Sequence, residues 1–350
     1  MNAWIQKISL IGVGILLCVF LIAIMFMALS IGTVPLSKTV ILETLIKAWQ
    51  SNLPIEAPGQ GGVHDIIWLL RLPRIVMATI IGAGLSVCGV VMQAIVRNPL
   101  ADPYILGISS GASLGATVAI LLEFSFILGE NSIGIMAFIG ALAISLGVIM
   151  IANVGGRASS TKLLLAGLAL SAMCSAFTSL VVYFANNKEG MQSIAFWMMG
   201  SMAGATWSLI KVLTIVIGIS VLFFWLQSRI LNLMLVGDET AITLGYDLNR
   251  YRQIHLLISS LIVGFAVYAA GIIGFVGLLV PHVVRLFVGT NHIKLIPISA
   301  IVGAIFLVTA DCLCRVLLPH AELPIGILIS VIGAPFFVFL MVKRTYSFGN

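Results

Sequence analysis

The residues that could do chemistry in this chain are few. His282, Asp311, Cys312 and Cys314 would together offer nitrogen, oxygen and sulfur ligands to a metal ion. Their spacing matches no known zinc motif, so a metal site is the weaker interpretation. Asp311 stands four residues before Arg315, which predicts an ion pair along one face of a helix instead.

A site for ATP is the next chemistry to consider. No stretch of the form G-x-x-x-x-G-K-[ST] occurs, so the chain has no phosphate-binding loop of that kind. We therefore expect no catalytic residue, cofactor or metal in this chain, and an energy source in an ion gradient or a partner chain. The five cysteines lie in apolar segments, which is typical of small core side chains rather than of disulfides.

These residues belong to a very apolar chain. Of its 350 residues 61% are apolar and 9% are charged, and the mean hydropathy is +1.18. Runs of roughly 20 apolar residues recur along its length, enough to cross about 30 Å of hydrocarbon. The pattern predicts an all-α integral membrane protein, one transmembrane domain over residues 1–350, with about ten spans. The expected spans are 8–32, 75–96, 104–122, 133–154, 162–184, 209–226, 254–273, 274–288, 293–318 and 323–341.

The charge pattern predicts the orientation of these spans. The net charge of +6 comes without a basic cluster, so we expect no nucleic-acid partner. Most of the 18 lysines and arginines fall on the cytoplasmic side if the N-terminus is cytoplasmic, in agreement with the positive-inside tendency. Both termini are then cytoplasmic. The first run lacks a small-residue cleavage site, so we expect it to be a span and not a cleaved signal peptide.

Two polar segments interrupt the spans. On the outer side, residues 33–74 form a loop with an amphipathic piece at 40–49. On the inner side, residues 228–252 contain a predicted short helix, 239–244, that ends at Gly245. The apolar side chains in and before this helix are Met234, Leu235, Ala241, Ile242 and Leu244. Because they lie outside the membrane, either a partner protein or this chain's own helix ends must cover them.

Arg71, Arg74 and Arg315 stand at span ends on the outer side, where positive charge is disfavoured. Guanidinium groups suit carboxylates, which predicts an acidic partner surface or an anionic ligand. The alternative is that the three side chains extend to lipid phosphates.

The stretch "RNPLADPYILGISSGAS", residues 97–113, breaks the helical pattern at two prolines and continues as a helix with a small-residue face. It is either a tight turn that leads into a packing helix or a part of a translocation path. Similar Gly- and Pro-rich breaks occur at residues 270–285 and 323–335, and breaks that recur in two halves are typical of transporters with inverted-topology repeats.

An ordered series of motifs then resembles the FecCD-type permeases of ABC importers. The motifs are "RLPR", "GAGLSVCGVVMQAIVRNPLADPYILGISSGAS", "LLLAGLALSAMCSA", "FWMMGS", "LGYD", "GFVGLLVPHVVRL" and "AELPIGILISVIGAPFFVFLM", which together cover residues 65–344. The resemblance implies a ten-helix subunit of a bacterial inner-membrane homodimer. It also implies two cytoplasmic ATP-binding subunits, which hold ATP and Mg, and a periplasmic or lipid-anchored binding protein.

The resemblance also assigns residues. In the family's cobalamin-carrying member, arginines at the positions of Arg71, Arg74 and Arg315 meet acidic residues of the binding protein. The region 228–252 matches cytoplasmic coupling helices between spans six and seven, and residues 97–103 match a cytoplasmic turn. The implied coupling residues are Val236, Gly237, Asp238, Glu239, Ala241, Ile242, Leu244 and Gly245. The implied path residues are Ser109, Ser110, Ser171, Ser175 and Thr178.

The family carries several cargoes, of which a ferric siderophore or haem comes first, then cobalamin, then molybdate or tungstate. Two other classes stay open from the residues alone. An ion-coupled secondary transporter requires acidic or histidine residues at mid-span. An intramembrane enzyme requires His282 to act together with Asp311 or a cysteine.

Overall fold

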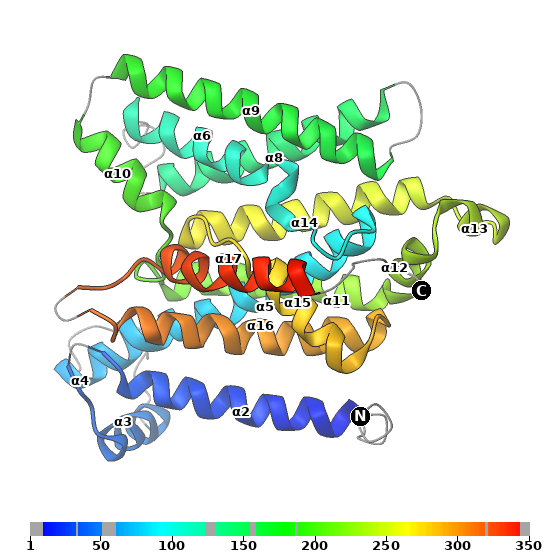
Figure 1. Ribbon diagram of the computed structural model, residues 1–350. Coiled ribbons are helices and arrows are strands. Elements are labelled where there is room, and N and C mark those ends of the chain that lie inside the picture. Colours follow the sequence, from blue (N-terminus) through cyan, green and yellow to red (C-terminus); the bar gives the residue numbers. More distant parts are fainter. Residues whose placement is uncertain are drawn as a thin grey trace.

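The computed structural model describes residues 10–32, 34–50, 61–122, 131–154, 159–185, 188–318 and 321–343, which form helices and their connections (Figure 1). In sequence order, the first half of the chain contains α2 (Leu10–Ser30), α3 (Lys38–Gln50), α4 (Gly62–Asp65), the π-helical η1 (Ile66–Arg71), α5 (Leu72–Val96), the 3-10 turn η2 (Pro103–Leu106), α6 (Ile108–Leu121), α8 (Ser132–Asn153) and α9 (Ser160–Ala185). After it follow α10 (Lys188–Met198), α11 (Trp207–Leu226), α12 (Ser228–Val236), α13 (Asp238–Thr243), α14 (Leu248–Ala270), α15 (Val276–Val288), α16 (His292–Cys314) and α17 (Ile325–Lys343).

The helices long and apolar enough to span a membrane match the predicted set. Within the described residues seven helices meet both requirements, and three shorter apolar helices accompany them at Ile108–Leu121, Val276–Val288 and Ile325–Phe339. The prediction of an all-α membrane protein with many spans is confirmed, and the total of about ten spans stays a prediction. The three short helices begin at the Gly- and Pro-rich breaks of residues 97–113, 270–285 and 323–335.

The bundle has two ends of different character (Figure 1). We call the end that carries α3, α4 and α10 the outer end, and the end that carries α12 and α13 the inner end. Helix α2 begins toward the inner end, and α17 runs from the outer end toward the inner one.

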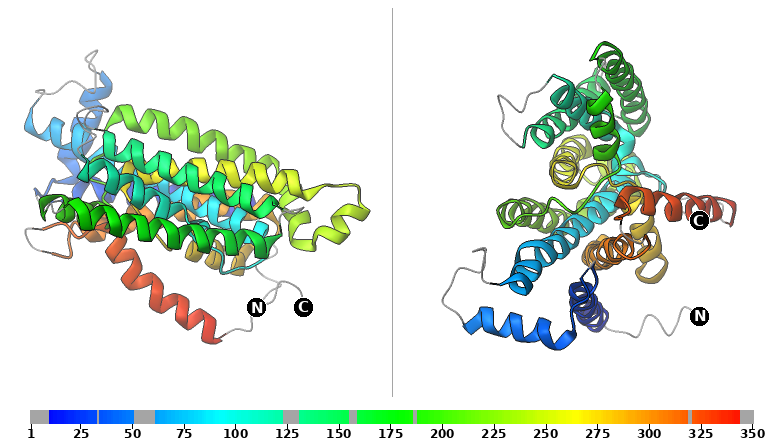
Figure 2. Two further views of the ribbon diagram at one scale, coloured as in Figure 1. Left: turned by 90° about the horizontal axis from the view of Figure 1, so that it is seen from above. Right: turned by 90° about the vertical axis from the view of Figure 1, so that its left-hand side faces the viewer.

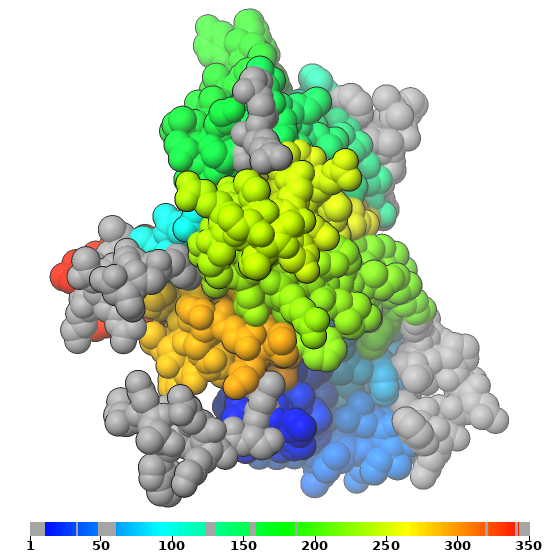
Figure 3. Space-filling model, turned by 90° about the vertical axis from the view of Figure 1, so that its right-hand side faces the viewer, coloured from blue at the N-terminus to red at the C-terminus, as the bar shows by residue number. Residues whose placement is uncertain are grey.

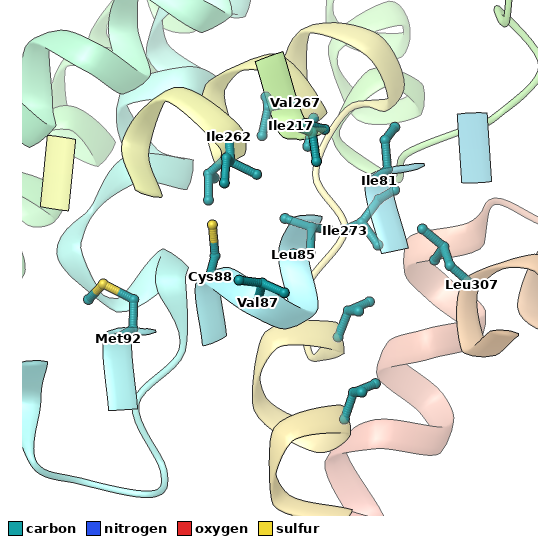
Figure 4. Packing of buried hydrophobic residues seen from close by; sticks show 14 of the residues in the cluster. Ile81, Leu85, Val87, Cys88, Met92, Ile217, Ile262, Val267, Ile273 and Leu307 are labelled. Carbon is teal, nitrogen blue, oxygen red and sulfur yellow. The ribbon is translucent and has the colours of Figure 1, made fainter. Parts of the chain in front are cut away.

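Helix α5 lies at the centre of the bundle, and almost all its residues from Pro73 to Val96 are buried. It contacts α11, α14, α15 and α16. Figure 4 shows Cys88 of α5 pointing toward Ile262 of α14, with Leu85 of α5 on the side of Ile217 of α11. On the other side of α14, helices α6, α8 and α9 pack on one another. Every element with a candidate functional residue is therefore held, directly or through α14, by α5.

Two glycines bring α5 and α15 into backbone contact. A Cβ at Gly89 would lie 1.8 Å from the carbonyl oxygen of Gly277, far inside van der Waals contact. Small residues allow membrane helices to approach this closely, which replaces the hydrophobic driving force that is missing in lipid. Gly82 and Gly303 create a similar crossing between α5 and α16.

The second span starts earlier than predicted, which is a correction to the expected outer loop of residues 33–74. Helical structure runs without a break from Gly62 through η1 into α5. Pro73 lies in the first turn of α5, where its missing N–H falls just after the wider π-helical turn. The helix therefore passes through "RLPR", and Arg71 and Arg74 are helical residues.

The inner polar segment also ends earlier than predicted, at residue 247 rather than 252. Asp247 accepts a hydrogen bond from the backbone N–H of Asn249 at 3.1 Å, so it caps α14 and starts that helix at Leu248. We call residues 228–247, with α12 and α13, the inner segment.

Helix α17 leaves the bundle at an angle (Figure 2). Its outer end is tied down, because the N–H groups of Ile325 and Gly326 donate to the carbonyls of Gly200 and Met199 at 3.2 and 3.0 Å. Many of its apolar side chains are exposed, among them Val331 and Phe339.

Candidate functional site

The structure brings Arg71, Arg74 and Arg315 together at the outer end, in what we call the outer arginine cluster. Arg71 comes from η1, Arg74 from the first turn of α5, and Arg315 from the residue that follows α16. Their partners come from three other places: the end of α2, Asp311 in α16, and Glu322 just before α17.

Two of these arginines bind the C-terminal end of α2. The Nη1 group of Arg71 donates to the carbonyl of Leu29 at 2.6 Å, and its Nη2 group donates to Val34. Arg315 donates to the carbonyl of Ile31 at 2.8 Å. The last carbonyls of a helix have no partner inside the helix, and the helix dipole favours a cation there. These arginines therefore complete the end of α2.

Arg74 lies between two carboxylates. Its Nε group is 2.7 Å from Oδ1 of Asp311, and its Nη1 group is 2.7 Å from Oε2 of Glu322. The other oxygen of Asp311 is 3.2 Å from Nη2 of Arg315. The predicted pair of Asp311 with Arg315 is thus confirmed, and Asp311 bridges two arginines in a site that leaves it 1% exposed.

We expect Asp311→Asn to destabilise the folded chain by about 2–3 kcal/mol, because the change keeps the shape of the side chain but leaves two buried guanidinium groups without their shared counter-charge. The measurement is the thermal unfolding midpoint in detergent. Glu322→Gln is the matched comparison: with 44% of its side chain exposed, it should cost less than about 1 kcal/mol. Equal midpoints for the two variants would contradict this account of the cluster.

The structure does not bring His282 to Asp311. His282 lies in α15 beside Pro99, Leu100 and Phe337, whereas Asp311 belongs to the outer arginine cluster. Among the described residues no group of three His, Cys, Asp or Glu side chains is placed to hold a metal ion. The two groups that an intramembrane enzyme would combine are therefore separate.

The inner segment has the helix that the sequence predicted, shifted by one residue to Asp238–Thr243. Gly245 follows it with a φ of +82°, and its N–H donates to the carbonyl of Ile242 at 2.9 Å. The N–H of Tyr246 donates to the carbonyl of Ala241 at 2.9 Å. These two bonds form a Schellman motif, which explains why glycine ends the helix.

The apolar residues of the inner segment divide into two sets. Met234 and Ala241 are buried and hold the segment on the bundle. Val236, Ile242, Leu244 and Tyr246 are exposed, at 59, 55, 61 and 44%. We call these four the exposed inner residues. Figure 3 shows the inner segment facing the viewer near the centre of the inner end, and Figure 2 (left) shows α13 projecting beyond the long helices.

Polar contacts fix the inner segment to the bundle. Asp238 pairs with Arg252 of α14 at 2.8 Å. A Cβ at Gly237 would lie 3.2 Å from Nη1 of Arg97, so the turn after α5 packs directly on the segment. Glu239 and Gly245 are exposed. Of the predicted coupling residues, Gly237, Asp238 and Ala241 thus hold the segment in place, and the others face outward.

Sequence reasoning missed Asn232 of α12. Its side-chain oxygen accepts the backbone N–H of His292 at 2.9 Å and lies 2.6 Å from the Nδ1 atom of that residue. Its side-chain amide donates to Asn291 at 3.1 Å. The inner segment therefore caps the first turn of α16. The asparagine within the otherwise apolar stretch "RILNLMLV" is the signal from which this capping role could have been predicted.

The predicted path residues lie on α6 and α9. Ser109 and Ser110 are half-buried in the first turn of α6, and Ser171 is half-buried in α9 and donates to the carbonyl of Gly167 at 2.7 Å. A Cβ at Gly107 would lie 2.6 Å from Oγ of Ser171, so the start of α6 adjoins the middle of α9. Ser175 is exposed and Thr178 half-buried on the same face of α9. That they line a path stays a prediction.

The connection predicted as a turn at residues 97–103 reaches into the bundle. Arg97 adopts a φ of +56° at the inner end, but a Cβ at Gly277 would lie 2.7 Å from Cδ of Pro103 and 3.0 Å from the carbonyl oxygen of Leu85. Leu85 is eleven residues from the inner end of α5, about 16 Å along the helix. The chain thus turns at Arg97 and re-enters the bundle before α6 begins. Non-helical backbone at this depth is tolerated because protein surrounds it.

Comparison with known proteins agrees with this architecture. The model of the FecCD transport family matches residues 19–343. The hemin transport system permease protein HmuU of Yersinia pestis is 41% identical over 281 residues, which are 79% of this chain and 84% of the relative. The cobalamin import system permease protein BtuC of Halobacterium salinarum is 40% identical over 294 residues, 82% of this chain and 77% of the relative.

A solved structure has the same fold. It is an inward-facing conformation of a metal-chelate type ABC transporter, 32% identical in sequence, and it superposes with a TM-score of 0.81 over 95% of this chain and 99% of its own.

Proposed function

The chain belongs to the FecCD transport family of ABC importer permeases, and we propose that it forms the membrane path of an ATP-driven importer for a metal chelate. Haem or a ferric siderophore is the cargo that we propose first, then cobalamin, then molybdate or tungstate. The hemin and cobalamin permeases among its relatives support a cargo of the metal-chelate class.

The observation that carries this proposal is the set of exposed inner residues. Val236, Ile242, Leu244 and Tyr246 present apolar surface outside the spanning helices, on a segment that the Asp238–Arg252 pair and Met234 hold firmly. Lipid does not cover a protrusion beyond the ends of the helices, so a protein partner must. Two cytoplasmic ATP-binding subunits, which hold ATP and Mg, are the partners that we propose for this surface.

We propose that the importer contains two copies of this chain. The exposed face of α9 with Ser175, and the exposed side chains of α17, are surfaces on which a second copy would pack.

We propose a periplasmic or lipid-anchored binding protein at the outer end, where Arg71, Arg74 and Arg315 are the docking residues. The proposed location is the bacterial inner membrane with both termini in the cytoplasm. The starting point of α2 near the inner end and the direction of α17 support this orientation (Figure 1).

An ion-coupled transporter is less well supported. Its coupling ion would need an accessible carboxylate, but Asp311 is held between Arg74 and Arg315 at 2.7 and 3.2 Å.

The test is to purify the chain gently from its native membrane, identify its partners by mass spectrometry, and reconstitute the assembly in vesicles. We expect an ATP-binding subunit in near-equal amount, and ATP-dependent uptake of one member of a panel of haem, a ferric siderophore, cobalamin and molybdate. A chain that purifies alone, with uptake that persists without ATP and collapses with an uncoupler, would contradict the proposal.

A further inference from the structure

Each guanidinium group of the outer arginine cluster already binds acceptors of this chain. Arg71 and Arg315 hold the end of α2, and Arg74 binds Asp311 and Glu322. A partner carboxylate that approaches Arg74 from outside therefore meets a guanidinium group that already faces two carboxylates, Asp311 and Glu322. These two negative charges would repel a third, so docking on Arg74 favours the exchange of an acceptor over the addition of one.

The acceptors differ in how easily they are replaced. Asp311 is 1% exposed and bridges two arginines. The carbonyls that bind Arg71 and Arg315 belong to the α2 end and cannot leave it. Glu322 is different, because 44% of its side chain is exposed and its described ion pair is with Arg74 alone. Glu322 is thus the acceptor that an external carboxylate can displace.

Glu322 also belongs to the segment that fixes the start of α17. The next residue, Leu323, donates its N–H to the carbonyl of Cys314 at 3.1 Å, and the N–H groups of Ile325 and Gly326 bind the connection that follows α10. The bond from Arg74 to Glu322 connects this segment to α5. Loss of this bond removes one of the contacts that hold the outer end of α17.

We propose that a carboxylate of the binding protein reaches Arg74 by displacing Glu322, so that docking exchanges one ion pair for another and loosens the start of α17. The proposal rests on the proposed function, because it takes an acidic binding protein as the partner. Glu322 then acts as an internal competitor, which keeps Arg74 paired and α17 tied until the partner arrives.

The tie itself is tested without any partner, by hydrogen exchange of the amides of Leu323, Ile325 and Gly326 in the reconstituted wild type and in Glu322→Gln. An ion pair of this exposure contributes up to about 1 kcal/mol, so we expect exchange up to about fivefold faster in the variant. The matched control is Glu189→Gln, in the exposed first turn of α10 at the same outer end, which changes the net charge equally. Equal exchange in Glu322→Gln and in the control would overturn the proposal.

The exchange of carboxylates is tested with the binding protein that the purification above identifies. Wild-type docking must break the Arg74–Glu322 pair, whereas docking to Glu322→Gln does not. We expect this variant to bind up to about fivefold more tightly than Glu189→Gln. Equal or weaker binding overturns the exchange. If no binding protein docks to the wild-type chain, the proposed function is overturned instead. The hydrogen-exchange test uses no partner, so its result on the Arg74–Glu322 pair does not depend on that outcome.

Discussion

Ile242→Asp is expected to abolish ATP-driven uptake while the permease stays folded. Ile242 is 55% exposed on α13, so the aspartate has access to water and costs the isolated chain little. In the assembly the same carboxylate would be buried against the ATP-binding subunit without a partner. Truncation or charge at the centre of an interface commonly costs 2 kcal/mol or more, so we expect a loss of more than about tenfold in assembly and uptake.

The control for this variant is Thr240→Asp. Thr240 is exposed, lies two positions earlier in α13 and therefore points about 200° away around the helix. It receives the same charge, and we expect uptake within about twofold of the wild type. The measurements are the amount of ATP-binding subunit that co-purifies and the rate of uptake into vesicles. Full assembly and uptake with Ile242→Asp would contradict the role of the exposed inner residues.

Gly89→Ala is expected to yield little or no folded permease. Alanine normally favours a helix over glycine by about 1 kcal/mol. At this position its Cβ would lie 1.8 Å from the carbonyl oxygen of Gly277. The clash is with backbone and not with a flexible side chain, so α5 and α15 must separate. We expect a loss of more than about 3 kcal/mol, because the separation also opens contacts along both helices.

Gly218→Ala is the matched variant for Gly89→Ala. Gly218 lies in the middle of α11, and no atom lies within 4 Å of a Cβ built there. We expect an unchanged or higher thermal midpoint, and a normal amount of monodisperse protein in size-exclusion chromatography. If both glycine variants behave alike, the close crossing of α5 and α15 is not what holds this bundle together.

The fold was predictable where a local pattern decides it. Apolar runs long enough to span the hydrocarbon located the spans. The Gly- and Pro-rich breaks coincide with the starts of the three short apolar helices α6, α15 and α17. Gly245 marked the end of α13, because a residue that tolerates a positive φ is needed there. The Asp311–Arg315 pair followed from a spacing of four residues on one helix.

The partners of Arg74 in the outer arginine cluster were not predictable from local pattern. Arg74 pairs with Asp311 and Glu322, which are 237 and 248 positions away in the sequence. A single sequence carries no periodicity over such separations. The same holds for Asn232, which binds His292 60 positions later.

The start of the second span, predicted at residue 75, was wrong because the helix continues through Pro73. Pro73 ends a regular α-helical hydrogen-bond pattern, but η1 provides a wider turn in front of it. The freed carbonyl of Trp68 in this turn accepts the indole N–H of Trp207 at 2.7 Å, so α11 stabilises the irregular turn. A contact between elements thus overrides a local signal.

Helix α16 connects the inner and outer ends of the molecule. Its first residue is capped by Asn232 of the inner segment, its last turn carries Asp311, and Arg315 follows it directly. Its 23 residues extend about 34 Å, and Pro297 interrupts its hydrogen-bond pattern near the inner end. One helix thus joins the Asn232 cap to the counter-ion of Arg74, beside the only half-exposed carboxylate described in that cluster.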